Sequence, residues 1–407
     1  MSNLKTLELI SIENHIMKKT FYIFPVLMCF VLLLQAQEPS VIVGAEQTDL
    51  YLPLLKGKRV ALFSNHTGMV QNKHVLDVLI ENHVNVTAVF SPEHGFRGDA
   101  GAGDHVASSV DAKTGVPIIS LYDGKDGKPT EESMRKFDIL IVDIQDVGLR
   151  YYTYYISMVR LMDACAENSK QMLILDRPNP NGHYVDGPIL DMKHKSGVGW
   201  LPIPVVHGMT LGELALMVNG EKWLPEGRVC KLSVITCLNY THETLYRLPI
   251  PPSPNLPNMT SIYLYPSICY FEATPVSLGR GTDLPFQIYG HPNMQGYDFT
   301  FTPRSMTSAL NPPQMDRLCY GTNLSDLADE AVWKKGIDLS YLIDAYRNLN
   351  MDHYFFRPFF EKLIGVDYVR KMILEGKSAD EIKAMWAGDV ENFKKQRRPY
   401  LLYHSNE

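Results

Sequence analysis

Hydrophobic and polar positions along the first half of the chain follow the rhythm of repeated strand–helix–strand units. Continuous apolar runs rich in β-branched residues predict strands that are buried on both faces. Between the first two runs, Val75, Leu76, Leu79 and Ile80 share one face of a predicted helix. The pattern therefore predicts an α/β fold with a largely parallel sheet covered by helices. The predicted strands are residues 58–63, 85–90, 116–122, 137–143 and 172–176.

Three further helices have clear sequence signals. Aromatic and aliphatic residues recur at helical spacing from Tyr151 to Ala166. Thr210 and Glu213 have the spacing of a capping box, so a helix should begin at Leu211. A second capping box, SADE at residues 378–381, predicts a packed helix near the end of the chain.

The polar residues of this half gather directly after the predicted strands. The loops are SNHTG, SPEHGFRG, YDGKDGK, DIQDVGLRYYTY and DRPNPNG. Open α/β sheets bind ligands outside the carboxyl ends of their strands, so these loops are expected to form a site. Turn formation explains each loop on its own equally well, because Asn, Asp, Gly and Pro are turn residues. The agreement of five loops favours a functional edge.

The composition of the chain changes after about residue 250, where the segment PIPPSPNLPNM begins. We place a larger domain at residues 38–255 and a smaller α+β domain at residues 256–407. The loop GRGTDLPF holds Arg280 and Asp283 and lacks strand or helix periodicity. It could close a cleft between the domains. The alternative is a turn held by an ion pair between these two residues.

The N-terminus predicts export. MKKT from Met17 supplies a positive start, and residues 21–34 form an apolar run too short to span a membrane comfortably. Cleavage is expected near Ala36, so residues 1–37 are an N-terminal extension and signal peptide, and the mature protein is periplasmic or secreted with no stable membrane span. Lipidation at Cys29 is the disfavoured alternative, because the preceding residue is Met28 rather than a small one.

Charge and missing motifs exclude several function classes. The net charge of −6 and a pI near 6.1 disfavour nucleic acid as a partner. The chain has no G-x-G-x-x-G after its first strand, no G-x-S-x-G and no H-E-x-x-H. His66, His94 and His207 lack the spacing of helical metal ligands. We therefore expect neither a cofactor nor a required metal.

The motifs taken together resemble those of a known family. SNHTG, SPEHGFRG, DIQDVGLRYYTY, LDRPNPNG, VHGMTLGELA, PSPNLPNM and YPSICYFEATPVSLGRGTDLPFQIYG are similar, in this order, to the NamZ-type exo-β-N-acetylmuramidases. The resemblance implies a Rossmann-like N-terminal domain, a smaller C-terminal domain and a site between them. It also implies removal of terminal N-acetylmuramic acid from the non-reducing ends of peptidoglycan fragments. The proposed catalytic glutamate of the family falls on Glu93.

Glycoside cleavage needs an acid and usually a second carboxylate. Glu93 suits the acid role if burial against Phe90 and Phe96 raises its pKa, and His94 would support or orient it. The second carboxylate is open among Asp143, Asp146, Asp176, Glu272 and Asp283.

Sugar recognition suggests further residues. Muramic acid carries a lactyl carboxylate, which a guanidinium of Arg97, Arg150 or Arg280 would bind. Tyrosines at residues 151, 152, 154 and 155 could stack on sugar faces, or they could belong to the core. The substrate-binding residues expected overall are Asn65, His66, Arg97, Asp143, Arg150, Tyr151, Tyr152, Asp176, Arg177, Asn179, His207, Arg280 and Asp283.

Two rival functions stay open at this point. A periplasmic protein that binds muropeptides or other sugars without cleaving them would also need two domains and a polar cleft. A sugar-phosphate or nucleotide-sugar transferase would need phosphate-binding glycines at a helix start, and the sequence lacks them.

Overall fold

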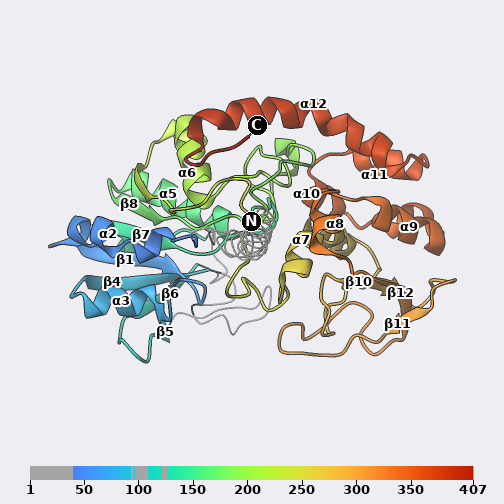
Figure 1. Cartoon of the computed structure of the whole chain (residues 1–407), viewed down its shortest axis with the longest axis horizontal. Helices are drawn as coiled ribbons and strands as arrows, with labels where there is room; N and C mark the ends of the chain where they lie inside the picture. The colour runs from blue at the N-terminus through green and yellow to red at the C-terminus, as the bar shows by residue number, and fades with distance from the viewer. Residues whose placement is uncertain (1–39, 93–95, 97–108, 122–126, 407) are drawn as a thin grey trace, which may run out of the picture. The chain divides into compact units, whose positions relative to one another are not determined.

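The apolar runs form strands of one sheet in the computed structural model, which describes residues 40–92, 96, 109–121 and 127–406 (Figure 1). Within these residues the sheet has seven strands in the order β5-β6-β4-β1-β7-β8-β9. Every neighbouring pair is parallel except β5 with β6. The strands are β1 (Arg59–Ser64), β4 (Asn85–Ser91), β5 (Ser109–Val110), β6 (Pro117–Ser120), β7 (Ile139–Asp143), β8 (Gln171–Leu175) and β9 (Lys231–Ile235), and a small hairpin adds β2 (Met69–Val70) and β3 (Lys73–His74).

The order of the parallel strands reverses at β1. Numbered along the chain, the parallel strands lie in the order 3-2-1-4-5-6, which is that of doubly wound, Rossmann-like sheets. Strands β1 and β7 are neighbours at the reversal, and Ser64 pairs with Asp143 at their carboxyl ends. Folds of this kind bind ligands in the crevice at such a point. The loops after β1 and β7 therefore start side by side where a site is expected.

Helices connect the strands in this half of the chain. α6 begins at Leu211 as predicted, because Thr210 Oγ1 accepts from the Glu213 amide and Glu213 Oε2 accepts from the Thr210 amide. The helix predicted from residue 151 begins at Tyr154 instead, with Thr153 as its N-cap. Tyr151 and Tyr152 thus precede the helix. The helices are α2 (Thr48–Leu55), α3 (Val75–Glu81), α4 (Glu131–Met134), α5 (Tyr154–Glu167) and α6 (Leu211–Gly220).

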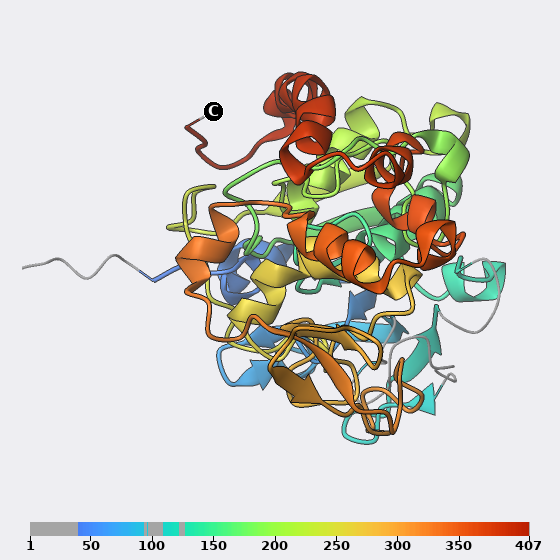
Figure 2. The same cartoon turned by 90° about the vertical axis from the view of Figure 1, so that its right-hand side faces the viewer.

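The chain beyond residue 258 forms a smaller region of helices and a three-stranded antiparallel sheet, which Figure 2 brings to the front. The sheet contains β10 (Ile288–His291), β12 (Cys319–Asn323) and β11 (Phe299–Phe301), in that order. The α/β prediction, with a largely parallel sheet and a smaller C-terminal region, is confirmed. The helices are α7 (Met259–Ile268), α8 (Asp329–Trp333), α9 (Ser340–Leu349), α10 (Phe360–Ile364), α11 (Tyr368–Leu374) and α12 (Ala379–Arg397).

The last long helix, α12, packs back onto the first half of the chain (Figure 1). The predicted capping box at its start is present. Trp386 Nε1 donates to Asp186 Oδ1 over 2.8 Å, and Arg397 donates to the His207 carbonyl over 3.3 Å. Residues Ile42–Glu407 accordingly form one compact unit. The domain boundary predicted after residue 255 stays a prediction.

Membrane-spanning helices are not found in the described part of the chain, where no helix is both long enough and apolar enough.

Candidate functional site

The loops at the carboxyl edge of the sheet are bonded to one another. The Gln145 amide donates to Thr67 Oγ1 over 3.0 Å, which joins the loops after β7 and β1. The Gln145 side chain also donates to the Pro178 carbonyl, in the loop after β8, over 2.7 Å. Arg177 donates to both oxygens of Asp143 over 2.6 and 3.0 Å. The structure therefore brings three of the polar loops together at one edge.

A cavity of about 550 Å³ lies beside this edge. Its volume suits a small-molecule ligand. One wall is the segment Tyr151–Tyr154, which leads from the loop after β7 into α5. Most of the remaining wall comes from the chain beyond residue 250. The lining residues outside the tyrosine segment are Val198, Ser253, Asn255, Leu256, Tyr265, Glu272, Leu278, Arg280, Phe286, Ser308, Ala309, Leu310, Asn311, Pro312 and Pro313.

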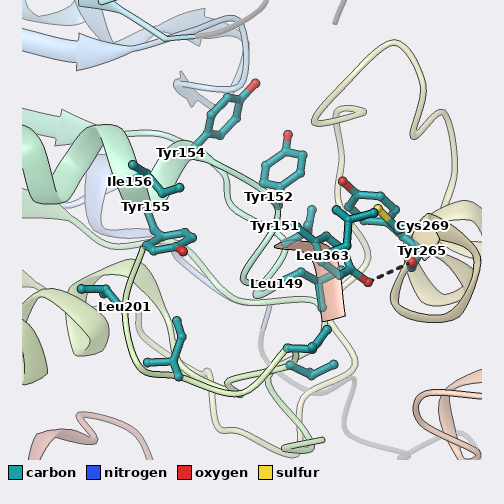
Figure 3. Close-up of a cluster of buried hydrophobic side chains, with 14 of the residues drawn as sticks. Leu149, Tyr151, Tyr152, Tyr154, Tyr155, Ile156, Leu201, Tyr265, Cys269 and Leu363 are labelled. Atoms are coloured by element: carbon teal, nitrogen blue, oxygen red, sulfur yellow. Dashed lines mark hydrogen bonds between the residues drawn. The ribbon is translucent and has the colours of Figure 1, made fainter. Parts of the chain in front are cut away.

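The tyrosines of the wall are held in place by hydrogen bonds. Tyr152 and Tyr154 lie edge to face, with ring centroids 4.8 Å apart, and both hydroxyls donate to the Pro252 carbonyl, over 2.8 and 3.4 Å. Asn65 donates to the Tyr154 hydroxyl over 3.0 Å, so this predicted site residue orients the wall. Figure 3 shows these two rings pointing the same way, whereas Tyr155 points elsewhere, and all three side chains belong to the buried cluster.

One ion pair faces the cavity. Arg280 donates to Glu272 over 2.7 Å, and the two side chains are 20% and 26% exposed. These are the two charged residues among the described lining of the cavity. The guanidinium also lies 5.0 Å from the ring centre of Phe286. Asp283 is exposed and does not line the cavity, so Arg280 pairs with Glu272 rather than with Asp283 as the turn hypothesis predicted.

Arg150 has a structural position instead of a ligand-binding one. Its guanidinium is fully buried and donates to four carbonyls, at distances of 2.7 to 3.0 Å. Burial lowers the pKa of this guanidinium. The carbonyls belong to Pro188, Ile203, Leu363 and Ile364, so the residue ties the loop before α5 to α10. It is not positioned to meet a substrate carboxylate.

Asp176 is likewise bonded within the protein. It accepts from Thr210 Oγ1 and the Tyr403 hydroxyl, each over 2.6 Å, and from the Gly212 amide over 2.9 Å. Burial raises its pKa to about 6. The carboxylate therefore stabilises the start of α6 and anchors the end of the chain.

Three more predicted site residues hold loop structure. The Asn179 side chain donates to the Met209 carbonyl over 2.9 Å, and His207 Nδ1 accepts from the Met209 amide over 3.2 Å. Burial lowers the pKa of His207 to about 3, so it is neutral near pH 7. His66 Nε2 lies 2.9 Å from the Pro251 carbonyl. None of these three lines the cavity as described.

Asp146 is the unusual carboxyl of this edge. It follows β7 and is 7% exposed. Its Oδ1 accepts from the Gly148 amide over 2.7 Å, whereas Oδ2 has no hydrogen-bond partner in the described part of the chain. Burial raises its pKa to about 7. The group is therefore poised to exchange a proton near neutrality.

Glu93, His94 and Arg97, the predicted catalytic pair and one candidate arginine, lie outside the described residues. The segment that holds them follows β4, which is paired with β1 on the side away from β7. Within that segment, Phe96 is described and buried, and its ring lies 4.8 Å from that of His74.

Much of the cavity wall has no strong signal in the sequence. Asn255, Tyr265 and Phe286 were not singled out, nor was the segment 308–313. Asn255 is buried and donates to the Ser308 carbonyl over 2.9 Å, while its Oδ1 has no partner among the described residues. The proline-rich segment that contains Asn255 is the available signal, and on the sequence alone it indicates only a domain boundary.

Both halves of the chain match models of one family. Residues 60–260 match "Exo-beta-N-acetylmuramidase NamZ, N-terminal", and residues 263–403 match the corresponding C-terminal model. A curated relative is the peptidoglycan beta-N-acetylmuramidase NamZ of Bacillus subtilis (strain 168). It is 38% identical over 392 residues, which cover 90% of this chain and 92% of that protein.

Two crystal structures from Bacteroides fragilis NCTC 9343, each described as a DUF1343 family protein, share the fold. One is 72% identical with a TM-score of 0.86, and the other is 28% identical with a TM-score of 0.76. In both cases the match covers 90% of this chain and 100% of the solved chain. On the evidence of both family models and the Bacillus relative, the chain belongs to the NamZ family of exo-β-N-acetylmuramidases.

Proposed function

We propose that this protein is an exo-acting β-N-acetylmuramidase that removes terminal β-1,4-linked N-acetylmuramic acid from the non-reducing ends of peptidoglycan fragments. The observation that carries the proposal is the 38% identity to the Bacillus subtilis enzyme over nearly the whole chain. The cavity supports it, because its tyrosine wall and its ion pair offer apolar surface and hydrogen-bonding groups together, as sugar binding requires.

Glu93 is the proposed general acid, which protonates the departing glycosidic oxygen. The second carboxylate then acts either as a base toward the attacking water or as a nucleophile whose glycosyl ester is later hydrolysed by water. The assignment of Glu93 rests on its place in the PEHG motif, which follows β4 in the sequence. His94 is proposed as its neighbouring support.

Two carboxyls are proposed as candidates for the second catalytic carboxyl. Asp143 is paired on both oxygens, Asp176 accepts three hydrogen bonds, and Asp283 is exposed outside the cavity lining. Asp146 and Glu272 remain. Glu272 lines the cavity, and Asp146 has an oxygen without a described partner. Replacing each by alanine and adding azide separates them, because azide can enter the space left by the side chain and restores turnover where a nucleophile or base has been removed.

Export is part of the proposal. The positive start at Met17 and the apolar run that follows support secretion with cleavage near Ala36, and lipidation at Cys29 is the disfavoured alternative. N-terminal sequencing of the protein isolated from cells tests this, and a mature protein that retains residues 17–36 would contradict it.

The decisive experiment compares wild type with Glu93→Gln on two substrates. The wild type should release N-acetylmuramic acid from a β-1,4-linked disaccharide and the aglycone from an aryl muramide. The variant should lose about 100- to 10,000-fold on the disaccharide. It should lose less on the aryl substrate, whose leaving group needs little protonation. Sugar binding by the wild type without any cleavage would favour the binding-protein alternative instead.

A further inference from the structure

The carboxyl edge and the cavity contain several arginines, and only one of those described is available to a ligand. Arg150 donates to four carbonyls, and Arg177 donates to Asp143 and to the Met69 carbonyl. Among the described residues, Arg280 instead donates a single hydrogen bond, from one terminal nitrogen to Glu272. A guanidinium has five N–H donors, so most of the donors of Arg280 remain for a ligand.

The surroundings of Arg280 fix its orientation. Glu272 holds one nitrogen at 2.7 Å, and the ring of Phe286 lies 5.0 Å below the guanidinium carbon. Both neighbours line the cavity with it. A guanidinium that is already oriented loses little conformational entropy when it binds a planar anion in two-point fashion. The burial of the site also strengthens such an interaction relative to water.

We infer that Arg280 binds the lactyl carboxylate of N-acetylmuramic acid and thereby sets the preference for muramic acid over glucosamine. The inference rests on the proposed function and adds the residue that recognises the lactyl group of the substrate. The lactyl group is the chemical difference between the two sugars, and its carboxylate matches the fork of a guanidinium. Glu272 orients the guanidinium, and its negative charge also limits the attraction for the substrate carboxylate.

Equilibrium binding of the two free monosaccharides tests the inference. Calorimetry should show that Arg280→Gln weakens N-acetylmuramic acid binding by about 10- to 150-fold, the loss expected for one charge-assisted pair. Binding of N-acetylglucosamine should change by less than about threefold. Glu272→Gln keeps an acceptor for Arg280 but removes the competing charge. It should strengthen binding of N-acetylmuramic acid alone, by about two- to fivefold.

The matched control is Arg304→Gln. Arg304 pairs with Asp316 on the surface, outside the described lining of the cavity, and its loss should leave the binding of both sugars unchanged. If Arg280→Gln weakens the binding of both sugars equally, or of neither, the inference is overturned. Cleavage by the wild type would still support the proposed function in that case. A wild type that neither binds nor cleaves muramides overturns both. Circular dichroism of each variant verifies folding.

Discussion

The fully buried guanidinium of Arg150 leads to the strongest stability prediction. Arg150→Met keeps an unbranched apolar stem and removes the donors to four carbonyls. The Ile203 carbonyl keeps a second donor, the Leu190 amide at 3.2 Å, so three carbonyls lose the donor that they have in the described structure. Each buried carbonyl left without a partner costs about 1–3 kcal/mol.

The variant also removes a buried charge, which recovers part of its desolvation cost. The net loss should therefore lie toward the lower end, at about 3–5 kcal/mol of unfolding free energy. Urea unfolding of the mature protein, followed by circular dichroism, measures it. Arg304→Met is the control, because its partner Asp316 is 61% exposed and such surface pairs contribute about 0–1 kcal/mol.

A loss below about 1 kcal/mol for Arg150→Met, equal to that of the control, would refute the reasoning. It would mean that the four carbonyls find other donors or water. A loss of the expected size would identify Arg150 as the group that joins the segment before α5 to α10 and so keeps the tyrosine wall in place.

Two further predictions concern neighbouring groups. Gly365 has φ +86°, and a Cβ there would lie 2.5 Å from Nη2 of Arg150, so Gly365→Ala should lower the melting temperature clearly. An unchanged melting curve would contradict the packing. Asp146 has a pKa raised to about 7 by burial, above that of the unfolded chain, so its contribution to stability is present at low pH and lost as pH rises toward 7. Relative to Asp146→Asn, the wild type should lose up to about 4 kcal/mol of unfolding free energy between pH 4 and pH 7.5, at about 1.4 kcal/mol per pKa unit. Urea titrations at the two pH values check this, and a pH-independent difference would exclude the raised pKa.

The strands and the capped helices could be predicted because their signals are local. The β-branched run at residues 137–143 favours a strand by its own composition. The pair Thr210 and Glu213 is enough to cap a helix. The start of α5 was placed three residues early, because tyrosines at helical spacing continue past the N-cap into the preceding loop. There the tyrosines line a cavity instead of extending the helix.

The roles of the arginines could not be predicted, since the sequence does not show which guanidinium is consumed by distant carbonyls and which stays at the cavity. Arg150 and Arg280 both lie beside glycine-containing turns and were equal candidates for the lactyl group. Arg150 meets carbonyls 38 to 214 residues away, whereas Arg280 meets a glutamate only 8 residues away and stays at a cavity wall. No local pattern distinguishes the two cases.

The cavity wall combines Tyr151 with residues as distant as Pro313, and this has a consequence for biosynthesis. The sheet is complete once residue 235 has emerged, but the cavity then lacks its second wall. Long-range contacts of this kind form late and slow folding. A nascent chain that ends after the sheet therefore lacks one wall of the cavity. A protein truncated at that point would expose the tyrosine wall and would be prone to aggregation. The cavity can therefore form only once the chain has been made as far as Pro313, after the last strand of the sheet.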